Sequence, residues 1–345
     1  MGQRKVGRGI RTGQDELSAS GESAFGVGNL NLEETRYPHR PVLVGEVLRL
    51  LLTDLEGTYV DGTAGSGGHS EALATRLGPK GRLICLDRDT EAVRLTKERL
   101  SLFGERVTVL KGNFSDLRRI LERLGQEKVD GILLDLGLST FQLDHSGRGF
   151  SFSRDEDLDM RMDQDGGVTA GDLLNTLPPK ELETILKRYG EERKAKRIAA
   201  LVERERSSGG IRSSLQLARL VESAVPRSRG PGAKNPATRT FQAIRIAVNR
   251  ELENLNAFLE DAPLLVGKDG RIAILSYHSL EDRMVKQTMV RWEKGCTCPR
   301  ELPRCACGMN PLFRRLNRKG IKPTKEEIAQ NPRSRSAVLR SAERV

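Results

Sequence analysis

The chain has 345 residues, with 58 Lys and Arg against 47 Asp and Glu, which gives a formal net charge of +11. Its content of 37% hydrophobic and 30% charged residues is typical of a folded globular protein with about two domains of ~150 residues each. No apolar run approaches the ~18 residues of a transmembrane helix, the start of the chain lacks the apolar core of a signal peptide, and five cysteines are too few for a disulfide framework. These features exclude a membrane-embedded or disulfide-stapled chain, and we expect a cytoplasmic protein.

The positive charge is concentrated in two stretches. Residues 187–245 hold 15 Lys and Arg against 5 Asp and Glu, and residues 311–345 hold 10 against 3. Clustered basic residues favour a polyanionic partner, because phosphate neutralisation releases counterions. Charge therefore predicts nucleic-acid binding, although helical surfaces are often basic for no such reason and charge alone does not separate RNA from DNA.

The first half of the chain predicts a parallel sheet. Residues 1–36 lack apolar periodicity, and we expect a disordered extension there. Short apolar strands then alternate with helical stretches, which is typical of a doubly wound α/β domain with helices on both faces. The expected strands are Thr58–Val60, Gly81–Leu86, Arg106–Leu110 and Val129–Leu134, and the expected helices are Pro41–Leu52, Glu71–Leu77 and Thr90–Phe103.

The alternation stops after residue 142. Helical stretches separated by Gly, Pro and Ser turns are expected over 143–245, at Thr169–Thr176, Pro179–Tyr189, Glu191–Arg206 and Ser213–Ala224. A long helix over Thr240–Leu259 and a buried strand over Gly270–Tyr277 follow, and that strand needs the earlier sheet as its neighbour. We therefore predict a sheet domain in two parts, 37–142 and 246–345, interrupted by an all-helical insertion over 143–245.

A glycine-rich loop, Asp61–Ser70, joins the first strand to its helix. Glycines at such a turn let the backbone approach a ligand. Asp87 ends the next strand, 20 residues after Gly67, where a carboxylate can accept hydrogen bonds from the ribose hydroxyls of an adenosine-type cofactor. Phe114 and Asp135 follow the third and fourth strands and are expected in the same pocket, because such sheets bind ligands at the carboxyl ends of their strands.

Three alternatives stay open from these residues. The glycine spacing departs from GxGxxG, which counts against an NAD-dependent dehydrogenase, and no GxxxxGK[ST] phosphate-binding loop occurs. A non-enzymatic RNA-binding module with a vestigial pocket and an enzyme that uses such a cofactor on DNA or protein are the other two.

Seven motifs in order resemble the MraW family of ribosomal RNA small subunit methyltransferases, from about His39 to the C-terminus. They are DGTAGSGGHS (61–70), LDRD (86–89), LLDLGLSTFQLD (133–144), RGFSF (148–152), LDMRMD (158–163), TFQAIRIAVNREL (240–252) and YHSLEDR (277–283). The resemblance implies a Rossmann-like S-adenosylmethionine-dependent methyltransferase, with a helical insertion for RNA recognition. It further implies methylation of N4 of a cytidine in the decoding centre (P site) of 16S ribosomal RNA within the small ribosomal subunit. The cofactor contacts it implies are Gly67, Gly68, His69, Asp87, Phe114, Asp135 and Gln142. The sequence departs from the family pattern in residues 1–36, in the segment Cys296–Cys307 and at Asn235, where a histidine is expected.

The catalytic groups are predicted less directly. Asp135 begins DLGLS where many amino-methyltransferases have [DNS]PP[YFW], so a Pro-Pro-aromatic clamp is unavailable, and Asp135 could accept an N4 hydrogen. His278, after the last strand, is either its catalytic partner or a hydrogen-bonded histidine at the strand end.

The candidates for contact with the RNA lie in two motifs. Asp159 and Arg161 of LDMRMD either reach the target nucleotide or pair with each other. In the long helix, Gln242, Arg245 and Asn249 share one face that could meet RNA. The opposite, apolar face is expected on the sheet and carries Ile244, Val248, Leu255 and Leu259.

Four cysteines, Cys296, Cys298, Cys305 and Cys307, form a CxC–x6–CxC pattern. Four thiols within twelve residues can hold a structural zinc ion, although zinc loops usually use CxxC. Reduced surface thiols are as good an interpretation as a metal site, and disulfides are a third, less favoured one, so no metal is assigned. The oligomeric state is open as well, with a homodimer as one option.

Overall fold

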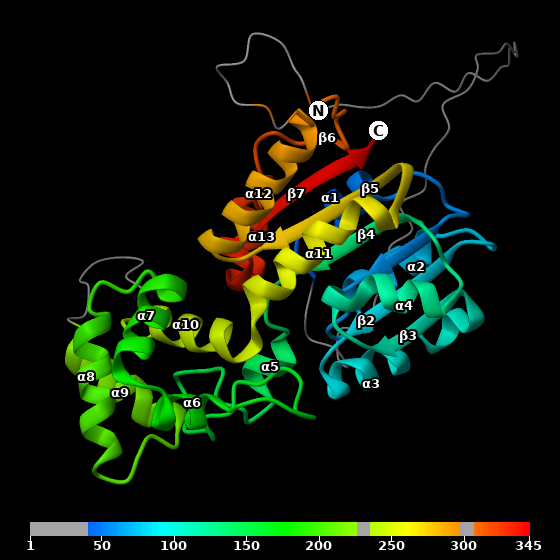
Figure 1. Cartoon of the computed structure of the whole chain (residues 1–345). Helices are drawn as coiled ribbons and strands as arrows, with labels where there is room; N and C mark the ends of the chain where they lie inside the picture. The colour runs from blue at the N-terminus through cyan, green and yellow to red at the C-terminus, as the bar shows by residue number, and fades with distance from the viewer. Residues whose placement is uncertain (1–40, 226–234, 297, 299–306) are drawn as a thin grey trace, which may run out of the picture. The chain divides into compact units, whose positions relative to one another are not determined.

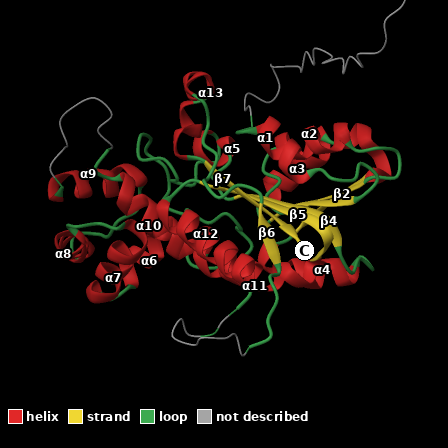
Figure 2. Cartoon of the chain, turned by 90° about the horizontal axis from the view of Figure 1, so that it is seen from above, coloured by secondary structure: helices red, strands yellow, loops and turns green. Residues whose placement is uncertain are grey.

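The computed structural model describes residues 41–225, 235–296, 298 and 307–345. The disordered extension expected over 1–36 lies outside the described residues. Seven strands form one sheet in the order β3-β2-β1-β4-β5-β7-β6 (Figure 1 and Figure 2). The strands are β1 (Thr58–Asp61), β2 (Arg82–Asp87), β3 (Val107–Lys111), β4 (Val129–Asp135), β5 (Val266–Ser276), β6 (Phe313–Arg315) and β7 (Val338–Arg344). Strands β1 to β5 pair in parallel, whereas β7 runs antiparallel to both β5 and β6.

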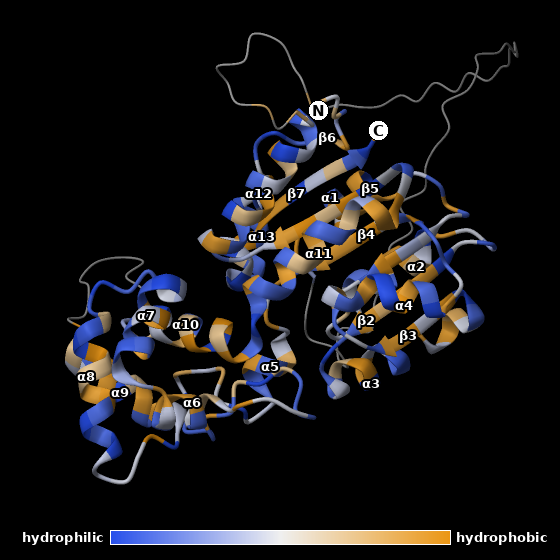
Figure 3. Cartoon of the chain, viewed as in Figure 1, coloured by the Kyte–Doolittle hydropathy of each residue, from blue (hydrophilic) through white to orange (hydrophobic). Residues whose placement is uncertain are grey.

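Helices cover both faces of this sheet, because successive residues of a strand point to opposite sides. Val60 and Ile132 enter a core shared with α4, α11 and α12, whereas Tyr59 and Leu133 enter a core shared with α1 and α2. The strands are accordingly apolar along the buried part of their length (Figure 3). The helices around the sheet are α1 (Val44–Leu51), α2 (Gly68–Arg76), α3 (Thr90–Arg99), α4 (Leu117–Arg123), α11 (Glu251–Leu265) and α12 (Ser279–Lys294). The predicted α/β fold class is confirmed.

The helical stretches after residue 142 have a core of their own, built from side chains between Phe150 and Ile244. They are α6 (Ala170–Thr176), α7 (Pro179–Gly190), α8 (Ala195–Arg206), α9 (Ser214–Ala224) and α10 (Thr238–Asn249), and the short helix α5 (Thr140–Asp144) precedes them. In the described part of 143–245 the β-structure is limited to an isolated bridge between Asp157 and Ser213. Domain limits at 142 and 245 stay a prediction.

The single helix predicted over Thr240–Leu259 is wrong. Arg250 adopts a left-handed conformation (φ 51°) that ends α10 and starts α11, although neither Gly nor Pro marks the break. Ile244 of α10 therefore packs in the helical core, while Leu255 and Leu259 of α11 pack on the sheet. The apolar face expected to lie wholly on the sheet is divided between two cores.

The C-terminal stretch 311–345 is not a free basic tail. It supplies β6, α13 (Lys325–Gln330) and β7, the last of which pairs with β5 along six residues. Three of its arginines form ion pairs with acids elsewhere, Arg315 with Glu293, Arg333 with Asp144 and Arg340 with Asp282, and Arg314 pairs with Glu343 of the same stretch. Part of its positive charge is thus matched within the fold. Among the described residues, no helix combines the length and the apolar character needed to span a bilayer.

Candidate active site

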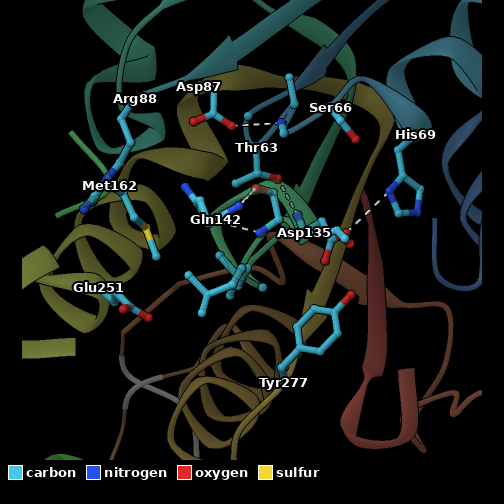
Figure 4. A pocket seen from close by; sticks show the side chains of 18 of the residues that line it. Thr63, Ser66, His69, Asp87, Arg88, Asp135, Gln142, Met162, Glu251 and Tyr277 are labelled. Carbon is cyan, nitrogen blue, oxygen red and sulfur yellow. Dashed lines mark hydrogen bonds and ion pairs between the residues drawn. The ribbon is translucent and has the colours of Figure 1, made fainter. Parts of the chain in front are cut away.

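A cavity of about 370 Å³ opens at the carboxyl ends of β1, β2 and β4 (Figure 4). Strand β1 lies between β2 and β4, where the strand order reverses, which is where open α/β sheets bind ligands. The volume is in the range of small-molecule sites. The glycine loop after β1 lines one wall, and residues around the break between α10 and α11 line another.

The glycine loop is held in a shape that side chains resist. Gly67 caps α2 with φ 83°, and a Cβ there would lie 3.1 Å from Arg99 and in the region that L side chains rarely adopt. At Gly68 a Cβ would lie 3.1 Å from Pro41. Gly68 lines the cavity, whereas Gly67 shapes the turn behind it.

Asp87 at the end of β2 presents its carboxylate to the cavity (Figure 4). Its Oδ2 accepts from the Gly65 backbone N–H at 2.8 Å, and its Oδ1 accepts from the Asp89 N–H at 2.9 Å. A carboxylate has about four lone-pair sites, so two stay available for hydroxyl donors. Burial raises the pKa of Asp87 to about 6, against the lowering effect of these two backbone hydrogen bonds.

Two further predicted contacts lie on the cavity wall. Phe114 follows β3 in a short 3₁₀ turn (Phe114–Asp116) and meets the ring of Phe258 edge-on at 6.0 Å. Gln142 is buried, and its amide is already used: Oε1 accepts from the Ser139 N–H at 3.1 Å and Nε2 donates to Asp89 at 3.0 Å. Gln142 thus ties α5 to the loop after β2.

Strand β4 places the Asp135 carboxylate between His69 and Tyr277 (Figure 4). The Asp135 N–H donates to Thr63 Oγ1 at 2.6 Å, which fixes the strand end against the glycine loop. Oδ2 of Asp135 lies 3.5 Å from His69 Nδ1, and its buried Oδ1 has no hydrogen-bond partner among the described residues. Because a buried acceptor without a donor costs about 1–3 kcal/mol, Oδ1 is ready for a donor from a bound molecule.

His69 has a defined tautomer in this arrangement. Its Nε2 lies 2.9 Å from the Val42 carbonyl oxygen, which can only accept, so Nε2 carries a hydrogen. In the neutral ring Nδ1 then presents a lone pair to the Asp135 carboxylate. That contact becomes favourable when a proton lies between the two atoms, so Asp135 and His69 together can hold a proton beside the cavity.

Tyr277 was not predicted as a site residue. Its hydroxyl points towards Asp135 (Figure 4), and burial first, then the charge of Asp135, raise the pKa of Tyr277 well above 10. The Tyr277 hydroxyl therefore stays protonated at neutral pH. The close approach of its ring requires Gly137, where a Cβ would lie 2.8 Å from the ring.

His278 does not line the cavity, contrary to the expectation that it is a catalytic partner of Asp135. It caps α12: its Nδ1 accepts from the Glu281 N–H at 3.4 Å, and its Nε2 lies 3.1 Å from Glu281 Oε1. The side chain turns into the start of the helix because it closes a capping box with Glu281. The alternative of a hydrogen-bonded histidine at the strand end describes it.

The predicted RNA contacts engage other parts of the protein. Asp159 and Arg161 pair with each other at 2.7 Å, the simpler of the two readings. The Gln242 amide donates to the Tyr189 carbonyl at 3.0 Å. Of the five candidates, Arg245 lines the cavity, where it makes two hydrogen bonds of 2.8 and 2.7 Å to Glu251.

Asn249 is buried at the break between α10 and α11 and joins the two parts of the fold. Its Oδ1 accepts from Arg88 and from the Met162 N–H, and its Nδ2 donates to the Met160 and Arg245 carbonyls. The amide has no group left for RNA in this conformation. Instead, Asn249 connects the loop beside Asp87 to the helical part, a contact that no local sequence pattern signals.

The glycine loop, the carboxylate of Asp87 and the open acceptor on Asp135 fit an adenosine-bearing cofactor with a charged, reactive end. Fold and site together define an S-adenosylmethionine-dependent methyltransferase. The model of the MraW methylase family matches residues 36–345. "Ribosomal RNA small subunit methyltransferase H" of Pelobacter propionicus is 49% identical over 310 residues, which cover 90% of this chain and 99% of the relative. The protein of the same name from Geobacter sulfurreducens is 48% identical over 309 residues, with 90% and 99% covered. The chain therefore belongs to the MraW methylase family, as the seven motifs indicated.

Cofactor affinity is expected to fall as the pH drops through about 6. Because burial raises the pKa of Asp87 to about 6, its carboxyl is neutral below that pH and is a weaker acceptor for ribose hydroxyls. Each pH unit below the pKa removes about tenfold of the ionised form, so the Kd of S-adenosylmethionine should rise by up to that factor per unit. Calorimetric titrations from pH 8 to pH 5 measure this slope. The Asp87→Asn variant is the control. Its Kd should be higher than that of the wild type and independent of pH. A pH slope retained in this variant would assign the titration to another group.

Proposed function

We propose that this enzyme transfers the methyl group of S-adenosylmethionine to N4 of a cytidine in 16S ribosomal RNA, at the decoding centre (P site) of the small ribosomal subunit. The names of the relatives support a small-subunit RNA substrate. Cytoplasmic localisation is part of the proposal, because ribosomal subunits are the substrate. We choose an amine as the methyl acceptor because Asp135 Oδ1, at the cavity, has no hydrogen-bond partner among the described residues. An exocyclic N–H₂ group is a donor that such an acceptor can orient.

The cofactor supplies an electrophilic methyl group on a sulfonium. The cytosine amine is a weak nucleophile because its lone pair is delocalised into the ring. In the proposal, Asp135 Oδ1 accepts one N4 hydrogen and directs the nitrogen lone pair towards the methyl group, which places the two reactants in near-attack geometry. As the N–C bond forms, the bond between the methyl group and sulfur breaks and neutral S-adenosylhomocysteine leaves. The N4 proton passes to Asp135 and is shared with His69 Nδ1, which the Val42 contact leaves able to accept it.

The other cavity residues act on position rather than on protons. Asp87 holds the ribose, Phe114 offers a face or edge to the adenine, and the glycine loop brings backbone N–H groups close. The protonated Tyr277 hydroxyl lies beside Asp135 and stabilises its negative charge before transfer. The target cytidine has to leave its stack to enter the cavity.

A basic surface on the helical part favours RNA as the partner. We define the α7–α8 basic cluster as the exposed residues Lys187, Arg188, Arg193, Lys194, Lys196 and Arg197. Lys187 pairs with Glu183, and the other five form no ion pair with the described residues. Helix α8 has no acid in its first turn, so the four charges at its start, Arg193, Lys194, Lys196 and Arg197, lie at the positive end of its dipole, which costs about 0.3–1 kcal/mol each. Lys187 and Arg188 lie in the last turn of α7, where the dipole favours positive charge. Helix stability does not explain the charges at the start of α8, whereas phosphate binding does.

Reversing this charge is expected to weaken RNA binding without lowering thermal stability. Replacing Arg193, Lys194 and Lys196 by Glu should raise the Kd for the small-subunit substrate at least ~10-fold. The slope of log Kd against log salt concentration should fall by about two to three, because fewer phosphates are neutralised. The measurement is a series of binding titrations at several salt concentrations.

The matched control reverses three exposed lysines near the amino ends of β2, β4 and β5, at the end of the sheet away from the cavity: Lys80, Lys128 and Lys268. It should leave the salt slope unchanged. An unchanged slope in the cluster variant, or an equal loss in the control, would mean that the α7–α8 basic cluster is only solvated surface.

The substrate class is tested by methyl transfer from labelled cofactor to three acceptors: small ribosomal subunits, double-stranded DNA and total protein from the same cells. Label in the ribosomal RNA of the subunits alone is the expected result. Label in DNA or protein at a similar rate would favour the alternative target classes.

A further inference from the structure

Three cysteines gather at the end of the sheet domain that is remote from the cavity. The thiols of Cys296, Cys298 and Cys307 all lie within 4.8 Å of one another. Two come directly after α12, and the third precedes β6, so residues from two separate chain segments meet. Helix α12 starts at the cavity and extends over sixteen residues, about 24 Å at 1.5 Å per residue, so this cluster is outside the catalytic site.

The two chain segments are held side by side independently of the thiols. The Leu312 N–H donates to the Trp292 carbonyl at 2.8 Å, and the rings of Trp292 and Phe313 lie 4.6 Å apart. Gly295 (φ 65°) ends α12 where a Cβ would lie 2.5 Å from the Asn310 backbone. Only glycine permits this approach, which brings Cys296 and Cys298 opposite Cys307.

We propose that Cys296, Cys298 and Cys307 bind a structural zinc ion. Zn²⁺ bound by thiolates at about 2.3 Å in tetrahedral geometry sets the sulfur atoms roughly 3.8 Å apart, which is inside the 4.8 Å limit on their separations here. An all-sulfur set selects a soft or borderline ion over magnesium or calcium. The ion closes the connection between α12 and β6 and thereby anchors the edge strand of the sheet. A water completes the tetrahedral set.

The test measures metal in the full-length protein purified without chelators under reducing conditions. About one zinc per chain by elemental analysis is expected, with loss of at least ~5-fold in the Cys296→Ser and Cys307→Ser variants. The Cys85→Ala variant is the matched control, because Cys85 is buried inside β2, and it should keep its zinc. Chelation should lower the Tm of the wild type and of Cys85→Ala but leave that of the two cluster variants unchanged, while the Kd of S-adenosylmethionine changes less than twofold.

Two further measurements keep the proposal testable if the variants fold poorly. The wild type loaded with Co²⁺ should show the intense sulfur-to-cobalt absorption of thiolate ligation. Zinc that does not bind to the wild type at stoichiometric concentration, or binding that Cys307→Ser leaves intact, would overturn the proposal. If the protein prepared without reductant contains no zinc and its mass is lower than that of the reduced protein by two or four hydrogens, the cysteines form disulfides instead.

Discussion

Replacing Asp135 by asparagine is expected to lower kcat by about 10²–10³-fold while the Kd of S-adenosylmethionine changes less than about threefold. The amide oxygen still accepts a hydrogen bond from the target amine, so the substrate keeps its orientation. It cannot take the proton, and proton transfer by a positioned side chain contributes about 10²–10⁴-fold. Single-turnover rates with bound substrate measure the chemical step, and calorimetry measures the cofactor separately.

The matched control is Asp130→Asn. Asp130 lies at the opposite end of the same strand and accepts from the Thr58 N–H at 2.7 Å, about 16 Å along β4 from Asp135. Its rate should stay within twofold of the wild type. An equal loss of turnover and of cofactor affinity in Asp135→Asn would make Asp135 a cofactor-binding residue rather than a catalytic one.

Replacing Asp87 by alanine should weaken S-adenosylmethionine binding about 100-fold. Two hydrogen bonds from ribose hydroxyls to a carboxylate are lost, each worth about 1.5–3 kcal/mol, and part of this is regained because a buried charge is removed. A net loss of about 2.7 kcal/mol corresponds to that factor. Calorimetry with the purified variant measures it, with circular dichroism to show that the fold is intact.

A cofactor analogue without ribose hydroxyls separates the direct contact from a loop effect. Asp87 also accepts from Gly65 and Asp89, so alanine loosens the glycine loop as well. If the ribose contact dominates, the wild type and Asp87→Ala bind the dideoxy analogue with similar Kd. A 100-fold difference that persists with the analogue would mean that Asp87 acts only by shaping the loop.

The cofactor half of the site could be predicted because its signals are local. A strand, a glycine turn and an acid at the next strand end follow each other within about thirty residues, and parallel strands bring their ends together whatever the rest of the chain does. This places Gly68, Asp87 and Asp135 on one cavity. Apart from binding a cofactor, little explains why acids and glycines occupy those positions.

The rest of the site depends on contacts between distant segments or on one backbone angle. Tyr277 lies beside Asp135 because β4 and β5 pair in parallel, although many helical residues separate these strands in the sequence. The break at Arg250 is a single left-handed residue in an otherwise helical pattern. Because of this break, Asn249, which was predicted to face RNA, is buried and connects the two parts of the fold. The strand β7 could not be predicted from its sequence because it contains the charged residues Arg340 and Glu343. Both side chains are buried, Arg340 in an ion pair with Asp282 and Glu343 in one with Arg271.

Identifying the methylated nucleoside is the sharpest test of the proposed reaction. Purified enzyme is incubated with labelled S-adenosylmethionine and small ribosomal subunits that lack this modification, and the RNA is digested to nucleosides. We expect label in N4-methylcytidine, from a single position in the decoding centre, and none with Asp135→Asn on the same time scale. Label in a different nucleoside, or cofactor binding with no label in ribosomal RNA, would contradict it.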